Sequence, residues 1–127
     1  MRLNDLQVRD WRNAEAAKLD LGSDLVVLWG ANGAGKTNLL EAMAVLATWK
    51  SFRSSSWEQV LRWGRPTATV SGLASSELGT AQLGVVVGRV DGGGCQRRVR
   101  MDGEAVREAG PYFSRLRAVT FTPDDVQ

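Results

Sequence analysis

A glycine-rich segment that ends in lysine and threonine constrains this chain more than any other feature. Residues 30 to 37 read Gly30-Ala31-Asn32-Gly33-Ala34-Gly35-Lys36-Thr37, which fits the phosphate-binding pattern G-x-x-x-x-G-K-[ST]. Residues 25–29 before it are continuously apolar, as a strand buried on both faces requires. After it, apolar residues recur at three- and four-residue spacing and predict a helix that begins near Lys36, with a buried face made of Leu39, Leu40, Met43, Leu46 and Ala47. A strand before the loop and a helix after it distinguish a nucleotide site from a chance glycine-rich turn.

Each part of this loop has a physical role in holding phosphate. Glycine allows the backbone to approach an anion and to turn successive N–H groups toward it. The start of the following helix adds unsatisfied N–H donors and the positive end of its dipole. Lys36 supplies a full positive charge for the β- and γ-phosphates of ATP, and the Thr37 hydroxyl is a ligand for Mg²⁺. We therefore predict that Gly30 to Thr37, together with Asn38, bind nucleotide.

Composition excludes several other classes of chemistry. The chain of 127 residues contains no histidine, so it has no His-ligated metal site and no His-based catalytic triad. Its single cysteine, Cys95, excludes an internal disulfide and fits a reducing cytosol. No apolar run approaches the roughly 20 residues of a membrane span, and the polar N-terminus does not resemble a signal peptide. We expect a cytoplasmic protein with one domain over residues 1–127.

The remaining patterns predict mainly strands. Residues 3–11 and 17–21 are expected to form two strands before the phosphate loop, and residues 118–121 a further strand near the end. Residues 67–73, 81–90 and 96–101 predict an antiparallel meander, with residues 91–94 as a hairpin loop and Asp102-Gly103 as a second tight turn. Short helices are expected over residues 57–63 and 110–116. The predicted fold class is α/β, with a mixed sheet around the phosphate loop.

Several segments together resemble one family of P-loop proteins. Residues 6–13, the phosphate loop, residues 38–42 and Lys50-Ser51-Phe52-Arg53 closely resemble the start of the RecF recombination-repair proteins, which have an ABC-type, SMC-like ATPase head. Residues 119–126 are similar to the family's F-x-P-E-D-L segment, with Asp124 where Glu is usual. The signature, Walker B pair and switch residue of such heads lie in a second lobe, and the 127 residues contain none of them. The chain thus looks like the first lobe only, either an excised fragment or a truncated product.

The resemblance implies a function for the whole protein. Members bind ATP and Mg²⁺, form an ATP-dependent homodimer, and grip DNA at single-strand/duplex junctions to help recombinase loading, with mediator proteins as partners. They act in DNA replication, recombination, repair and the SOS response to DNA damage. Hydrolysis in that arrangement needs the second lobe and a second subunit. We therefore assign no catalytic residue to this chain and expect it alone to hydrolyse ATP at background rates.

The resemblance also implies further site residues. Arg12 and Asn13 are expected to lie close to the nucleotide. This interpretation is favoured over the alternative, in which Arg12 is simply an exposed arginine that follows a strand. Asp124 and Asp125 fall where such heads approach Mg²⁺, so Asp125 is a candidate metal ligand, although the pair equally fits a helix cap. Lys50, Arg53, Arg62 and Arg65 are candidate DNA-phosphate contacts, as is the cluster Arg97, Arg98 and Arg100, and solvated surface charges explain both clusters equally well.

Two other residue types are interpreted as structural. Glu41 lies four residues after Thr37 and is expected to be a solvated helical glutamate. The five tryptophans are expected to anchor the core and the lobe interface rather than to stack on bases. Two other functions remain open: a non-catalytic nucleotide-binding or DNA-interaction module, and the head lobe of another SMC-like ABC ATPase.

Overall fold

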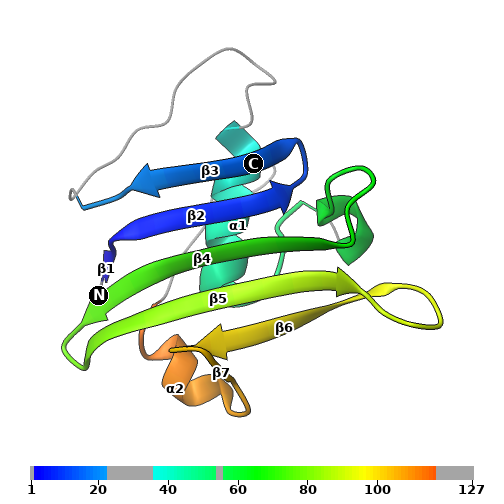
Figure 1. Ribbon diagram of the computed structural model, residues 1–127. Helices are drawn as coiled ribbons and strands as arrows, with labels where there is room; N and C mark the ends of the chain where they lie inside the picture. Colours follow the sequence, from blue (N-terminus) through cyan, green and yellow to red (C-terminus); the bar gives the residue numbers. More distant parts are fainter. Residues whose placement is uncertain (1, 23–35, 54–55, 117–127) are drawn as a thin grey trace, which may run out of the picture.

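The computed structural model describes residues 2–22, 36–53 and 56–116. Its main element is an antiparallel sheet in which the strand order is β3-β2-β4-β5-β6-β7, with β1 paired to β4 (Figure 1). The strands are β1 (Arg2–Leu3), β2 (Asp5–Trp11), β3 (Ala14–Asp20), β4 (Thr67–Ser76), β5 (Gly79–Arg89), β6 (Cys95–Met101) and β7 (Glu104–Ala105). The helices are α1 (Lys36–Thr48), the 3-10 helix η1 (Trp57–Val60) and α2 (Ala109–Phe113). The predicted strands over residues 25–29 and 118–121 lie outside the described residues.

The meander predicted from sequence is confirmed. Strands β4 and β5 pair along their whole lengths, from Thr67↔Gly88 to Ser76↔Gly79. Strand β6 pairs with β5, and the Asp102-Gly103 turn leads into β7. Alternation along these strands sends one set of side chains into the core, because successive side chains of a strand point to opposite faces. The core set includes Val70 and Ala74 of β4 and Leu83, Val85 and Val87 of β5.

Helix α1 covers one face of the sheet and lies against β2, β4 and β5 (Figure 1). It begins at Lys36, as the sequence predicts, and its buried face matches the predicted one in part. Leu46 and Ala47 are buried as predicted, and Leu39 and Met43 are partly buried against the core, whereas Leu40 is 47% exposed and Ala42 and Val45 are fully buried instead. The helix also buries Glu41, which is charged and therefore does not belong to the apolar pattern that predicts the buried face. The buried face therefore overlaps the predicted one but is shifted toward Ala42 and Val45 and away from Leu40.

An aromatic cluster fixes the end of α1 to α2. Trp49 follows the helix with a left-handed φ of 65°, a conformation that usually belongs to glycine at this position. Its ring packs against Tyr112, with ring centroids 5.0 Å apart, and against Phe113, at 4.5 Å. The Tyr112 hydroxyl donates to the Leu46 carbonyl oxygen, and burial raises the pKa of Tyr112 well above its usual range. These contacts hold Trp49 in its unusual conformation.

Two predicted helices are shorter than expected. The first ends at Val60 rather than at residue 63, because Leu61 turns to extended backbone and pairs with Trp11. The second ends at Phe113. The described tryptophans differ in burial: Trp11 is fully buried, as predicted, and Trp49 and Trp57 are partly buried against the core, but Trp63 is 97% exposed and takes no part in this core.

Gly72 lies where the sheet leaves no room for a side chain. A Cβ atom there would lie 2.4 Å from the Asp5 carbonyl oxygen and 2.8 Å from Leu3 Cδ1. We expect Gly72→Ala to lower the free energy of unfolding by about 1–3 kcal/mol, the usual cost of overpacking. Gly84 on β5 is the matched control, because its nearest contact would be 3.8 Å. Urea titrations in which Gly84→Ala is the more damaging change would contradict this account.

Candidate nucleotide-binding site

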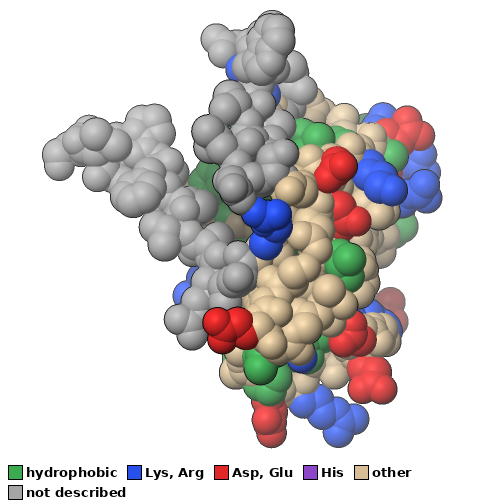
Figure 2. Space-filling view, turned by 90° about the vertical axis from the view of Figure 1, so that its left-hand side faces the viewer, with side chains coloured by type: hydrophobic (Ala, Val, Ile, Leu, Met, Phe, Trp, Pro, Cys, Tyr) green, Lys and Arg blue, Asp and Glu red, His purple; other side chains and the backbone are tan. Residues whose placement is uncertain are grey.

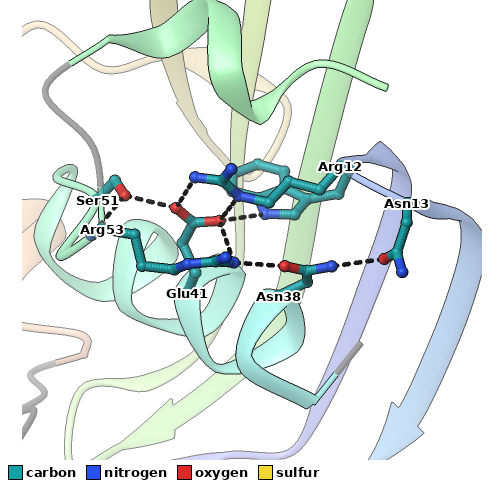
Figure 3. A network of polar contacts seen from close by, with 7 residues as sticks. Arg12, Asn13, Asn38, Glu41, Ser51 and Arg53 are labelled. Atoms are coloured by element: carbon teal, nitrogen blue, oxygen red, sulfur yellow. Dashed lines mark hydrogen bonds and ion pairs between the residues drawn. The ribbon is translucent and has the colours of Figure 1, made fainter. Parts of the chain in front are cut away.

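The turn between β2 and β3 meets the first two turns of α1. Arg12 and Asn13 form this turn, because Trp11 pairs with Ala14. The Asn38 side-chain amide, one residue after Thr37, donates to Asn13 Oδ1 at 2.5 Å. Arg53, from the segment after α1, donates in turn to Asn38 Oδ1 (Figure 3). Asn13 and Asn38, predicted as nucleotide contacts, and Arg53, predicted as a DNA contact, thus form one polar chain beside the helix N-terminus.

A buried carboxylate lies behind this chain. Glu41 has no exposed surface, and it accepts hydrogen bonds from Arg12 Nε at 2.5 Å and Arg12 Nη2 at 2.7 Å (Figure 3). It also accepts from Trp11 Nε1 at 3.2 Å and from Ser51 Oγ at 2.5 Å. Arg53 Nη1 lies 3.9 Å from Glu41 Oε1. The sequence interpretation of Glu41 as a solvated residue is therefore wrong.

The charges of this pair stabilise each other. Burial opposes ionisation of Glu41, but the hydrogen bonds from Arg12, Ser51 and Trp11 outweigh it and lower the pKa of the carboxyl group. The hydrogen bond to Glu41 in turn raises the pKa of Arg12, despite partial burial. A two-pronged contact of this kind matches the planar fork of arginine to a carboxylate. At neutral pH the site therefore holds an ionised pair.

Sequence reasoning missed Glu41 and Ser51, although the sequence contained a signal. Helix α1 reads KTNLLEAMAVLAT, and Glu41 is its only acidic residue. A lone carboxylate among apolar helical residues requires a cationic partner when it is buried. Arg12 and Arg53 are both candidates for this cationic partner, but the periodicity of the sequence does not reveal which of them faces the helix.

The structure describes only some of the other predicted site residues. Lys36 and Thr37 open α1, as the motif requires, with Thr37 exposed. Residues 30–35 of the phosphate loop and the candidate metal ligand Asp125 lie outside the described residues. Within residues 2–22, 36–53 and 56–116, no three acidic or cysteine side chains gather to hold a metal. Thr37 is thus the described residue that remains a candidate magnesium ligand.

The candidate DNA contacts do not form one patch. Arg62 Nη1 lies 3.9 Å from Glu15 Oε2, and Arg65 Nε lies 3.9 Å from Asp10 Oδ1, so both are partly neutralised. In β6, Arg97 lies over the Trp49 ring at 5.4 Å and donates a hydrogen bond to the Trp49 carbonyl oxygen. Figure 2 shows basic and acidic side chains intermixed over the face that it presents. Lys50 is exposed, and its role as a DNA contact remains a prediction.

A helix that begins with Lys-Thr, packed on a strand-rich sheet beside an Arg-Asn turn, has the architecture of a P-loop ATPase head of the ABC type. Comparison with known proteins supports this class. The family model for the AAA domain matches residues 5–86, well over half of the chain. The SMC head domain from Thermotoga maritima has the same fold, with a TM-score of 0.57 over 84% of this chain and 39% of that chain, at 14% identity.

Over its whole length the chain is similar to one group of proteins in particular. The DNA replication and repair protein RecF of Myxococcus xanthus is 36% identical over 127 residues, which is all of this chain and 32% of that protein. RecF of an Anaeromyxobacter species is 38% identical over 126 residues, or 99% of this chain and 33% of that protein. A solved structure of the recombination mediator RecF with ATP superposes with a TM-score of 0.83 at 25% identity, over 97% of this chain and 32% of that chain.

The chain belongs to the AAA domain family, and over its whole length it is similar to the RecF proteins. It spans about a third of the length of the relatives that it matches. None of the helices in the described segments is long and apolar enough to cross a membrane.

Proposed function

We propose that this chain is the ATP-binding lobe of a RecF-type DNA repair protein. The observation that carries the proposal is the junction between the Arg12-Asn13 turn and the start of α1, where Asn38 bonds Asn13 one residue after Thr37. This junction adds side-chain donors to a helix N-terminus, which already favours an anion. The similarity to a RecF structure with ATP over 97% of the chain supports the same conclusion.

Within this proposal the described residues have separate tasks. Lys36 provides a positive charge for the terminal phosphates, and the Thr37 hydroxyl is placed at the helix start, where it would hold Mg²⁺. Arg12 supplies a second cation beside them. When bound, Mg²⁺ would neutralise phosphate charge, and Asp125, which lies outside the described residues, is proposed as a further ligand for it. These residues supply one ammonium, one guanidinium, one hydroxyl and two side-chain amides. This set of donors fits a nucleoside triphosphate.

We further propose that ATP controls DNA binding in the complete protein. RecF relatives are named for DNA replication and repair, and the relative of known structure is called a recombination mediator. ATP would promote a homodimer that binds gapped DNA at single-strand/duplex junctions and aids recombinase loading with mediator proteins, in the cytoplasm and during the SOS response. Lys50, Arg53, Arg62 and Arg65 are proposed to contribute phosphate contacts, which carry no sequence preference.

Fluorescence anisotropy with labelled gapped DNA tests this switch in the full-length protein. We expect tighter binding to gapped DNA with ATP and Mg²⁺ than without nucleotide, and a steep loss of affinity as salt rises, because each phosphate contact releases counterions. A blunt duplex of equal length is the control for junction preference. DNA affinity that is indifferent to ATP would refute the proposed switch while leaving nucleotide binding intact.

A further inference from the structure

Glu41 uses its whole hydrogen-bonding capacity inside the protein. A carboxylate has about four acceptor sites, and Glu41 receives hydrogen bonds from Trp11 Nε1, from two nitrogens of Arg12 and from Ser51 Oγ. It has no exposed surface. Trp11 and Arg12 lie at the end of β2 and in the turn after it, and Ser51 lies in the segment after α1, so one carboxylate joins helix α1 to two other segments of the chain.

Arg12 is hydrogen-bonded to Glu41, but this contact does not occupy all the donors of its guanidinium group. A guanidinium carries five N–H donors, and Glu41 takes one from Nε and one from Nη2, so three remain for another acceptor. The Arg12 side chain keeps 17% of its surface exposed, whereas the side chain of Glu41 keeps none. The pair therefore combines a fully buried carboxylate with an arginine side chain that is still partly exposed.

The backbone around Arg12 is also unusual. Asp10 and Arg12 have left-handed φ angles of 52° and 50°, which are uncommon for residues with a side chain. Such conformations persist when the surroundings enforce them, and they gather at functional sites. Here the Arg12 N–H donates to the Val60 carbonyl oxygen at 2.7 Å, and the Arg62 N–H donates to the Asp10 carbonyl oxygen at 3.0 Å. The turn is thus fixed on its backbone side as well as at its guanidinium.

Glu41 lies on the same helix as the candidate phosphate-binding residues. It follows Thr37 by four residues in α1, which places it one helical turn further along. A fixed turn of helix therefore sets the distance between the carboxylate and the Lys36-Thr37 start. Whatever orientation Glu41 imposes on Arg12 is defined relative to the nucleotide site.

We propose that Glu41 is a positioning residue, which holds the Arg12 guanidinium at the N-terminus of α1 so that its remaining donors face the nucleotide phosphates. This inference rests on the proposed nucleotide-binding function. It predicts that Glu41 affects ATP binding only through Arg12. A buried pair with a purely structural task would instead alter folding and leave the ATP affinity of the folded protein unchanged.

A double-mutant cycle in the full chain, with ATP titrated by calorimetry, tests this inference. We expect Glu41→Gln and Arg12→Gln each to weaken ATP binding by about 10- to 100-fold, the range of a charge-assisted contact. The double variant should be no weaker than Arg12→Gln alone, because Glu41 then has nothing to position. Ser51→Ala is the matched control: it removes another donor to the same carboxylate, and we expect less than about a threefold change in affinity.

Each outcome of this cycle decides something. If wild type binds ATP, Lys36→Ala loses it and Glu41→Gln keeps wild-type affinity, the proposed function stands and the positioning role is refuted. Additive effects of the two substitutions would also refute it. If the wild-type chain binds no ATP, both proposals fall together.

A second variant covers the case in which Glu41→Gln does not fold. Glu41→Asp keeps the charge but withdraws the carboxylate by one methylene, so we expect a smaller loss of ATP affinity and faster exchange of the Arg12 Nε–H proton by NMR. Unchanged affinity and unchanged exchange in Glu41→Asp would overturn the inference. Wild-type protein with a rapidly exchanging Arg12 Nε–H would do the same without any nucleotide.

Discussion

Replacing Lys36 with alanine is expected to weaken ATP binding by about 100-fold or more. The ammonium group is the mobile full charge that the motif directs at the β- and γ-phosphates, and it stands at the first residue of α1, where the helix dipole favours the same anion. The loss is expected to be smaller for AMP, which lacks those phosphates. Calorimetric titration of ATP and of AMP into the wild-type protein and into Lys36→Ala measures the loss of affinity for each nucleotide.

Lys18→Ala is the control for a general loss of positive charge. Lys18 is an exposed lysine on β3, paired with Gln7 rather than with any residue of the site. Its replacement should leave ATP affinity unchanged. An ATP titration of Lys36→Ala that matches wild type would remove the phosphate loop from the binding site.

The second large effect is expected on stability. Replacing Glu41 with methionine leaves the Arg12 charge in a largely buried place without its partner, and such a change costs about 3–5 kcal/mol. The Arg12→Met/Glu41→Met double variant should recover much of this loss, because an apolar pair of similar volume replaces a buried ion pair well. Recovery is expected to be incomplete, since Trp11 Nε1 and Ser51 Oγ still lose their acceptor.

Urea unfolding of the single and double variants measures these free energies. The surface pair of Arg62 and Glu15 is the matched control, because its charged atoms are 3.9 Å apart and both side chains are partly exposed. Arg62→Met should cost no more than about 1 kcal/mol. A double variant as unstable as Glu41→Met would contradict the view that an unpaired charge causes the loss.

The stability difference between wild type and Glu41→Met depends on pH because the pKa of Glu41 is lowered in the folded protein. The folded state binds the Glu41 proton more weakly than the unfolded chain, in which the pKa of this carboxyl group is near 4.5. The contribution of Glu41 to stability is therefore complete above that value and is lost as pH falls through the lower pKa of the folded state. We expect the gap between wild type and Glu41→Met to be constant from pH 6 to 8 and to shrink below about pH 4.5. A gap that widens in acid would contradict the pKa direction.

The β meander was predictable because its information is local. Alternating residues in β4 and β5, the glycine-rich loop at residues 91–94 and the Asp102-Gly103 turn each specify a hairpin within about ten residues of sequence. The start of α1 was equally local, since the motif itself places a helix after Lys36. Helix face was less predictable. Leu40 and Leu46 look equivalent in a periodic pattern, yet one is exposed and the other buried, because the aromatic cluster at Trp49 and the sheet select the packed side.

The phosphate motif is what the sequence by itself determined: Lys36 and Thr37 at the start of a helix, with Arg12 and Asn13 as candidates from an earlier turn. Only the tertiary structure decided how these parts meet. Glu41 reads as an ordinary helical glutamate until the β2–β3 turn and the segment after α1 bring two arginines, an indole and a hydroxyl to it. The physical reason is that burial reverses the preference of a carboxylate for water only when donors from remote segments replace that water, and no local pattern records which donors arrive.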